Sequence, residues 1–346
     1  MGERVLVAMS GGVDSSVAAL LLQRQGFAVA GATFLLFDGQ AGEAADAAAV
    51  CRVLGIPHHL LDYRGLFARE VMGRFAQAYL AGRTPNPCIT CNRAVKFGAF
   101  LEDARRLGYR RIATGHYAHV QQDPATGLWQ LWKSLQPQKD QSYVLYHLSQ
   151  EQLEALELPL DALDKEQVRQ LARQAGLPVH DKGDSQDICF VPDGDYAGFL
   201  RRSCGVQPRE GQFVDGEGRV LGTHRGFWQY TIGQRRGLGL SLGRRMFVCR
   251  LDPAENRVVL GEEGALFSRQ MQVEDLRMVD GRPLEEPLEA QVKIRYAHPP
   301  APAVIHPLPD GRGARVEFQQ PQRAATAGQA AVFYQGNRVL GGGTIR

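Results

Sequence analysis

The stretch RVLVAMSGGVDSSVAALLLQRQG, residues 4–26, decides the fold of this 346-residue chain. Residues 4–9 contain a short apolar run of the kind that a parallel sheet buries on both faces. Residues 15–25 read as a helix that Gly26 ends. A strand, a turn with two glycines and a helix in this order predict the first unit of a doubly wound α/β domain.

The same alternation continues over the first 205 residues, which we predict to form one α/β domain. Strands are expected at 28–37, 56–62 and 111–114, helices at 43–54, 66–80, 93–107 and 165–175, and a hairpin at 119–133. From about residue 206 the pattern changes to short alternating segments broken by Gly and Pro, which indicates β structure. The charged, proline-containing stretch 280–287 suggests a second break within this half.

Composition indicates an ordinary globular protein, with 44% hydrophobic residues. We find no apolar run of roughly 18 residues and no secretory leader, and therefore expect a cytoplasmic protein. Six cysteines without a small disulfide-dense module fit a reducing compartment.

Charge divides unevenly along the chain, whose formal net charge is +3. Residues 201–346 carry 21 Lys+Arg against 15 Asp+Glu, and residues 1–200 carry 19 against 22. The run from Arg219 to Arg250 holds seven arginines and no acidic residue, with His224, Phe227, Trp228 and Tyr230 interleaved. Such a run can neutralise phosphates and stack an unpaired base, which predicts an RNA surface; a solvated β surface with core aromatics is the alternative.

The SGGVDSS string, residues 10–16, aims backbone N–H groups and a helix N-terminus at an anion. No Lys-Ser/Thr pair follows the glycines, so this is not a Walker A loop. Asp14 is placed to hold Mg²⁺ against a released pyrophosphate. The alternative is a glycine turn with a serine N-cap. The string resembles the signature of PP-loop ATP pyrophosphatases, which adenylate a substrate oxygen.

Two cysteines stand three residues apart in TPNPCITCN, residues 84–92, just before a predicted helix. The helix dipole is expected to lower the pKa of Cys88 and Cys91 and favour thiolate. A structural zinc half-site is the alternative, although the chain has no second C-x-x-C motif. Cys51 and Cys249 lie in apolar stretches and are expected to be buried, whereas Cys189 ends the polar stretch DSQDIC, residues 184–189.

These motifs together resemble the bacterial tRNA-specific 2-thiouridylase family over nearly the whole chain. The segments that carry the resemblance are SGGVDSS (10–16), GRTPNPCITCN (82–92), KF (96–97), ATGHYA (113–118), KDQSY (139–143), DSQDICF (184–190), TIGQRRGLG (231–239), AGQAAVFY (327–334) and GGGTI (341–345). The resemblance implies a PP-loop domain (1–205), a small β-rich central domain (206–268) and a C-terminal β-barrel that binds tRNA (269–346).

The resemblance also implies a chemistry, in which ATP adenylates O2 of the wobble uridine and a cysteine persulfide delivers sulfur to C2. By motif, Cys189 would carry the persulfide, Cys91 would be its partner, and a disulfide bond would form. The implied ATP contacts are Ala8, Met9, Ser10, Gly11, Gly12, Val13, Asp14, Ser15, Phe34 and Gly115. The segment from Phe34 to Gly39 is shorter than is usual in the family, which puts the Phe34 contact in doubt.

The implied substrate is the anticodon stem-loop of the tRNAs for lysine, glutamate and glutamine. The implied tRNA contacts are Asn86, Pro87, Cys88, His116, Lys139, Asp140, Gln141, Arg295, Tyr296 and Gln329. A cysteine desulfurase or a relay protein would supply the persulfide, and we expect a monomer.

One position leaves the sulfur route open, because Cys88 stands where some members of the family have aspartate. Cys88, Cys91 and Cys189 together could instead ligate a [4Fe-4S] cluster with one iron open for sulfide. Two rival functions also remain: another PP-loop tRNA-modifying or amidating synthetase, which has no use for the two thiols, and a non-catalytic RNA-binding protein.

Overall fold

The computed structural model describes residues 2–183 and 188–346, and it confirms the predicted fold class. Five parallel strands form the first sheet, in the order β3-β2-β1-β4-β7. The strands are β1 (Arg4–Ala8), β2 (Ala28–Leu35), β3 (His58–Asp62), β4 (Arg111–Ala113) and β7 (Leu156–Glu157). Parallel strands of this kind are the predicted βαβ units, and their carboxyl ends share one edge.

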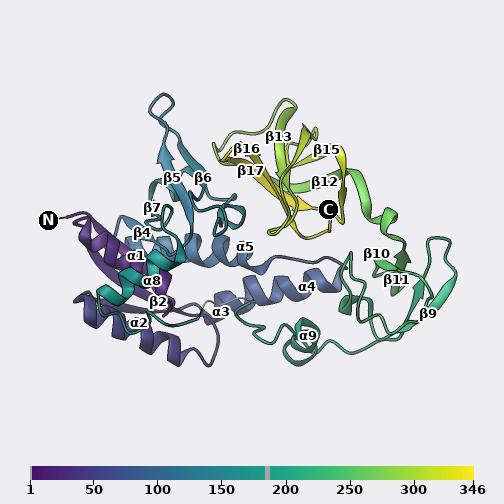
Figure 1. Ribbon diagram of the computed structural model, residues 1–346, viewed down its shortest axis with the longest axis horizontal. Helices are drawn as coiled ribbons and strands as arrows, with labels where there is room; N and C mark the ends of the chain where they lie inside the picture. Colours follow the sequence, from purple (N-terminus) through teal and green to yellow (C-terminus); the bar gives the residue numbers. More distant parts are fainter. Residues whose placement is uncertain (1, 184–187) are drawn as a thin grey trace.

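Helices cover both faces of this sheet because successive side chains of β1 point to opposite sides. Val5 and Val7 belong to one core, under α1 (Val13–Arg24), α2 (Ala41–Leu54) and α8 (Lys165–Gln174). Leu6 belongs to the other core, which includes side chains of α3 (Arg64–Phe67), η1 (Ala68–Gly73) and α6 (Phe100–Arg106). Figure 1 shows α1, α2 and α8 grouped beside the sheet at the N-terminal end of the molecule.

The two remaining long helices are less regular than predicted. The helix expected at 66–80 is α3, the π-helical η1 and α4 (Arg74–Leu80) in succession. The helix expected at 93–107 begins earlier, as α5 (Pro87–Cys91), and continues through the π-helical η2 (Asn92–Ala99) into α6. π-Helical turns are rare and concentrate at functional sites, and η2 starts directly after Cys91.

The central β structure forms a four-stranded sheet, ordered β10-β11-β8-β9, from β8 (Gly211–Val214), β9 (Val220–His224), β10 (Phe247–Asp252) and β11 (Arg257–Gly261). Its core is shared with α4 and with α9 (Tyr196–Cys204). Phe227 and Trp228 lie in this core, 8% and 3% exposed. The expectation that they offer faces to an unpaired base is therefore wrong for these two rings, which are needed to pack the sheet.

The C-terminal strands form a closed antiparallel barrel, in which β12 pairs with β17 to complete the ring. The strands are β12 (Phe267–Met278), β13 (Leu288–Lys293), β14 (Ala301–Pro307), β15 (Gly313–Arg323), β16 (Ala330–Gln335) and β17 (Arg338–Ile345). Gly341 has a φ of 158°, and a Cβ there would lie 2.3 Å from the Arg277 carbonyl oxygen. The glycines of β17 thus let the ring close.

The hairpin of the first domain, β5 (Ala118–Gln122) and β6 (Trp129–Lys133), extends this barrel sheet. Leu131 and Trp132 of β6 pair with Val339 and Arg338 of β17. Figure 1 shows the hairpin standing next to the barrel strands β16 and β17. The first and last domains are therefore joined by backbone hydrogen bonds. Of the helices that the structure describes, none is both long and apolar enough to cross a membrane.

His147 is a buried histidine whose protonation couples the stability of the core to pH. Burial lowers its pKa from 6.5 to about 3, and within the described structure neither ring nitrogen has a hydrogen-bond partner. Between pH 6.5 and 3 the unfolded chain therefore takes up a proton that the folded protein does not. The free energy of unfolding falls with pH in this window by about 1.4 kcal/mol per unit for this group.

We expect His147→Phe to remove that contribution. Urea unfolding at pH 7 and pH 5 measures it: the loss between the two pH values should be about 2 kcal/mol smaller in the variant. His306→Phe, at a ring that solvent reaches, is the control. Equal losses in wild type and His147→Phe would contradict the assignment.

Candidate active site

The glycine loop connects β1 to α1 at the carboxyl edge of the parallel sheet. Gly12 is the N-cap of α1, and no side chain caps this helix, so its first N–H groups are available to an anion. This excludes the alternative of a serine N-cap. Ser15 and Ser16 instead donate their hydroxyls to the Gly12 carbonyl oxygen, at 3.1 and 2.8 Å. Gly11 has a φ of +69°, and a Cβ there would lie 2.5 Å from the Glu43 carbonyl oxygen.

Asp14, in the first turn of α1, is held by two side chains that the sequence did not single out. Lys165 Nζ lies 2.8 and 2.9 Å from the two carboxylate oxygens, and Tyr117 Oη donates to one of them at 2.8 Å. Lys165 begins α8, and Tyr117 follows β4. The Lys165 ammonium thus lies on the carboxylate predicted to hold a metal cation. Asp14, Tyr117 and Lys165 are far apart in the sequence, so only the three-dimensional structure shows that they are in contact.

Gly115 lies against the same loop. A Cβ there would meet the Ser15 nitrogen at 2.8 Å and the Asp14 carbonyl carbon at 2.9 Å. Its neighbour His116 is 8% exposed, and its Nδ1 lies 2.8 Å from the Thr114 hydroxyl. Burial lowers the pKa of His116 well below its usual value, with Lys96 adding to the effect. The His116 ring is therefore neutral and enclosed by protein.

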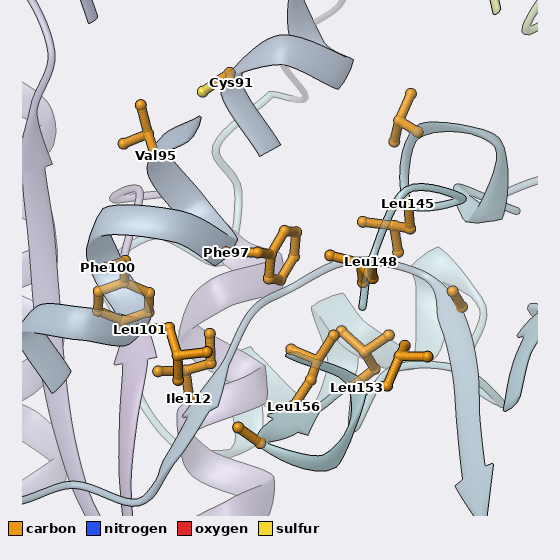
Figure 2. Packing of buried hydrophobic residues seen from close by; sticks show 14 of the residues in the cluster. Cys91, Val95, Phe97, Phe100, Leu101, Ile112, Leu145, Leu148, Leu153 and Leu156 are labelled. Atoms are coloured by element: carbon orange, nitrogen blue, oxygen red, sulfur yellow. The ribbon is translucent and has the colours of Figure 1, made fainter. Parts of the chain in front are cut away.

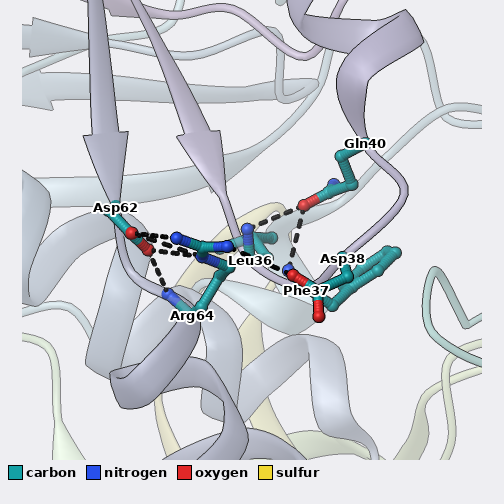
Figure 3. A network of polar contacts seen from close by, with 6 residues as sticks. All are labelled: Leu36, Phe37, Asp38, Gln40, Asp62 and Arg64. Atoms are coloured by element: carbon teal, nitrogen blue, oxygen red, sulfur yellow. Dashed lines mark hydrogen bonds and ion pairs between the residues drawn. The ribbon is translucent and has the colours of Figure 1, made fainter.

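The shortened segment after Phe34 is folded by its own polar contacts, shown in Figure 3. The Gln40 side-chain oxygen accepts from the backbone of Leu36 and Phe37, at 2.7 and 3.2 Å. Arg64 binds Asp62, and its hydrogen bonds lower the pKa of that carboxyl to about 2. The Phe34 ring itself packs on Tyr63 and Phe100, with centroids 5.3 and 4.8 Å away. The Phe34 ring is thus partly buried against the hydrophobic core.

Cys91 ends α5 and lies at the edge of the hydrophobic cluster, beyond Val95 and Phe97, as Figure 2 shows. It is 8% exposed, whereas Cys88 and Cys189 are exposed. Asp184–Asp187, which precede Cys189 in the predicted motif, lie outside the described residues.

The expectation that the helix dipole lowers the pKa of Cys91 is wrong. Burial raises the pKa of Cys91, with Lys96 opposing and Cys88 adding to the shift. The surrounding protein atoms raise the pKa of Cys189 to about 12; a thiolate at Cys91 or Cys88 would raise it further, whereas Lys96 opposes the shift. The three thiols are therefore within electrostatic range of one another and of Lys96, and their surroundings favour the protonated forms of Cys91 and Cys189.

These thiols do not form a ready metal site. Within the described ranges, no three or more His, Cys, Asp or Glu side chains are grouped so that they could hold a metal ion. A zinc or iron-sulfur site would need the three cysteines to move closer together.

Several of the residues predicted to contact tRNA are bonded to one another around Asp140. Asp140 is 9% exposed, and its carboxylate accepts from Ser134 N and Ser142 N at 3.1 Å each. Gln141 exchanges hydrogen bonds with the backbone of Tyr117. Tyr296 is 42% exposed, and its Oη donates to the Asp140 carbonyl oxygen at 3.2 Å. Burial is the main cause of the raised pKa of Tyr296, and a thiolate at Cys88 would add to it.

The other residues predicted to contact tRNA lie on α5, on the barrel and on the turn that contains Asp140. The Asn86 side chain caps α5 by accepting from Cys88 N, with Pro87 as the first helical residue. Gln329 donates to the Thr84 carbonyl oxygen at 2.7 Å, and Arg295 donates to the Arg323 carbonyl oxygen at 3.3 Å. Lys139 lies next to Asp140 on the same turn and is partly exposed.

The site combines two groups of residues: the glycine loop with Asp14 and Lys165, and the thiols of Cys88, Cys91 and Cys189. The glycine loop and Asp14 suit phosphate chemistry at the carboxyl edge of the sheet. The thiols suit transfer of sulfur, since they provide nucleophiles once deprotonated.

Three family profiles match consecutive parts of the chain. They are a tRNA methyl transferase HUP domain at residues 3–193, a tRNA methyl transferase PRC-barrel domain at 197–262, and an aminomethyltransferase beta-barrel domain at 268–345. The chain is 48% identical to the tRNA-specific 2-thiouridylase MnmA of Heliobacterium modesticaldum, over 100% of this chain and 93% of the relative. It is 50% identical to the protein of the same name from Desulforudis audaxviator, over 99% and 98%.

Solved structures resemble the chain only loosely. A 4-thiouridine synthetase–RNA complex with bound ATP has a TM-score of 0.36 at 18% identity, covering 56% of this chain and 46% of that chain. An NMN synthetase from Francisella tularensis has a TM-score of 0.35 at 19% identity, covering 53% and 66%.

Gly115 offers a test of the glycine loop. We expect Gly115→Ala to weaken ATP binding about fivefold or more, because the added methyl group would press on Ser15 and Asp14, and such overpacking costs about 1–3 kcal/mol. Isothermal titration with ATP and Mg²⁺ measures the effect. Gly65→Ala, where a Cβ meets nothing within 4 Å, should bind as wild type does. Wild-type affinity in Gly115→Ala would show that this contact does not shape the nucleotide site.

Proposed function

The chain belongs to the tRNA-specific 2-thiouridylase family, and from this premise we propose that it converts the wobble uridine of tRNA to 2-thiouridine with ATP. The observation that carries the proposal is the coexistence of the uncapped phosphate loop with the group of Cys88, Cys91 and Cys189. A PP-loop enzyme that makes an amide has no use for these thiols, and a protein that only binds RNA has no use for the loop.

ATP is proposed to bind along Ala8–Ser15, with its phosphates on the first N–H groups of α1. The Phe34 ring is partly buried on Tyr63 and Phe100, so its backbone and the open side of its ring are available to the nucleotide. Asp14 is the residue that would hold Mg²⁺, whose oxygen preference it meets and whose charge would stabilise the departing pyrophosphate. Mg²⁺ would replace the Lys165 ammonium on Asp14 and so make Lys165 available to the phosphates.

In the first step, O2 of the uridine attacks the α-phosphorus and pyrophosphate leaves. In the second, the outer sulfur of a Cys189 persulfide attacks C2, and AMP leaves with the oxygen. Cys91 then attacks the Cys189 sulfur, which forms a Cys91–Cys189 disulfide and frees the 2-thiouridine; an external thiol reductant restores both cysteines. Since the surrounding protein raises the pKa of both thiols, we propose that bound tRNA changes these surroundings before the transfer.

The tRNA for lysine, glutamate or glutamine is proposed to place its anticodon loop between the first domain and the barrel. Asn86, Pro87 and Cys88 would meet the target base, and the exposed ring of Tyr296 would stack on it or on its neighbour. Lys139, Gln141, Arg295 and Gln329 would hold the backbone, together with arginines of the 219–250 run. The buried carboxylate of Asp140 supports the turn that presents Lys139, and the enclosed His116 supports the floor of the site.

The proposed chemistry requires a sulfur donor. Either a cysteine desulfurase or a relay protein transfers sulfur to Cys189 and so forms the persulfide. The enzyme works as a monomer in the cytoplasm, where its tRNA substrate is found.

Nucleoside mass spectrometry of tRNA from a deletion strain tests the function. We expect 2-thiouridine derivatives at the wobble position to disappear, and to return with the wild-type gene but not with Cys91→Ser or Cys189→Ser. Cys51→Ser is the matched control and should restore the modification, because this thiol belongs to α2 and is buried in the core that does not contain Cys91. Normal 2-thiouridine in the deletion strain would overturn the proposal.

Cys88 distinguishes the two sulfur routes. The persulfide route predicts that Cys88→Ser and Cys88→Asp retain activity and that anaerobically purified protein contains no iron. The alternative, a [4Fe-4S] cluster on Cys88, Cys91 and Cys189, predicts bound iron in wild type and its loss, with activity, in both variants. Iron analysis beside the thiolation assay decides between them.

A further inference from the structure

The segment of residues 83–93, which carries Cys88 and Cys91, is held at both ends by the barrel. At one end, Thr84 N donates to the Ala327 carbonyl oxygen at 2.8 Å, and Gln329 returns a hydrogen bond to the Thr84 carbonyl oxygen at 2.7 Å. The neighbouring Arg83 forms an ion pair with Glu274. We call residues 83–93 the cysteine segment.

At the other end of the segment, Arg93 Nη1 lies 2.5 Å from Asp275 Oδ2. Asp275 and Glu274 are adjacent on β12, close to where this strand pairs with β17 to close the barrel. Asp275 has a φ of +52°, a conformation in which few residues other than glycine, asparagine and aspartate are found. One short piece of the barrel thus binds both ends of a segment that belongs to the first domain.

Close contact at Thr84 depends on Gly328, whose φ is +90°. A Cβ at this position would lie 3.0 Å from both the Thr84 nitrogen and the Arg83 Cβ. A larger residue would push the turn at 324–329 away from the segment. The hydrogen bond from Thr84 N to the Ala327 carbonyl oxygen therefore requires a glycine at position 328.

The middle of the segment and the barrel line a common cavity of about 180 Å³, with Pro85, Pro87 and Ile89 on one side and Gly328, Ala330 and Thr344 on the other. Cys91 and Ile89 also pack in the hydrophobic cluster that includes Ala330 and Val332 of β16. Because the packing beside the cavity is incomplete, the polar contacts at Arg83, Thr84 and Arg93 help to set the position of the segment relative to the barrel.

We propose that the barrel positions the cysteine segment for the reaction, with Glu274 and Asp275 as the positioning residues. They touch neither ATP nor the reacting sulfur atoms. They act by fixing the ends of the segment whose last turn holds Cys91 beneath the target base. This inference rests on the proposed function, to which it adds a second task for the domain assigned to tRNA binding.

A charge swap across the domains tests it, using Arg83→Glu, Glu274→Arg and the double variant. Each single variant places like charges together and should lower kcat for 2-thiouridine formation about tenfold or more, as a displaced reacting group does. The KM for ATP and the Kd for tRNA should stay within about twofold of wild type, and the double variant should regain most of the rate. Arg105→Glu breaks a more exposed pair with Glu151 inside the first domain and should change nothing.

A second readout needs neither tRNA nor activity. Alkylation of Cys91 in the full-length free enzyme, followed by peptide mass spectrometry, should be faster in both single variants and return to the wild-type rate in the swap. Gly328→Ala should also raise the rate, whereas Gly336→Ala, at a turn where a Cβ meets nothing within 4 Å, should not. The glycine pair decides the question if the charge variants fail to fold.

The outcomes are distinguishable. Equal alkylation of Cys91 in all variants, or a loss of rate that the swap does not restore, overturns the positioning role. A change in tRNA Kd alone also overturns it, because Arg83 and Glu274 would then act on the RNA. Wild-type enzyme that makes no 2-thiouridine contradicts the proposed function, while the alkylation cycle still tests the contact.

Discussion

The approach of the α1 N-terminus to the carboxyl edge of the parallel sheet is the constraint on which the rest of the structure depends. Ala8 ends β1, and α1 begins only five residues later, so the turn must be tight and must present its N–H groups. Gly11 has a left-handed conformation and lies close to the Glu43 carbonyl oxygen, and Gly115, which follows β4, has no side chain that would collide with Ser15. Because these backbones are so close, Asp14, Tyr117 and Lys165 can meet from three elements that are distant in sequence.

A second feature separates the two halves of the chemistry. The phosphate loop is rigid, with serine hydroxyls bound to Gly12 and a carboxylate bound on two sides. Cys88 and Cys91 lie instead on the short helix α5, and Cys189 lies in a turn; Cys91 is buried, whereas Cys88 and Cys189 are exposed. An enzyme that must first activate an oxygen and then exchange sulfur benefits from this division, since the nucleotide needs a fixed cradle and the thiols must change partners.

The sequence predicted local features well and spatial coincidences poorly. The apolar run at 4–9 and the glycine at 26 were enough to predict β1, α1 and the doubly wound domain. The π-helical η2 was not predictable, since its residues have an ordinary helical pattern. Phe227 and Trp228 were misjudged because aromatic residues between arginines suit a core as well as a base-stacking surface. The sequence does not reveal the raised pKa of Cys91, because the helix dipole can be inferred from position, whereas burial depends on a cluster that includes distant residues such as Val144 and Leu145.

The pairing of β6 with β17 also bears on how the chain is made. The β5–β6 hairpin emerges from the ribosome some 200 residues before Arg338 and Val339, which finally occupy its outer edge. Until then, β6 exposes unpaired N–H and carbonyl groups beside Trp129 and Trp132, and such an edge recruits other strands. The nascent first domain is therefore vulnerable to aggregation throughout synthesis of the other two, and truncation near the C-terminus would leave that vulnerability permanent.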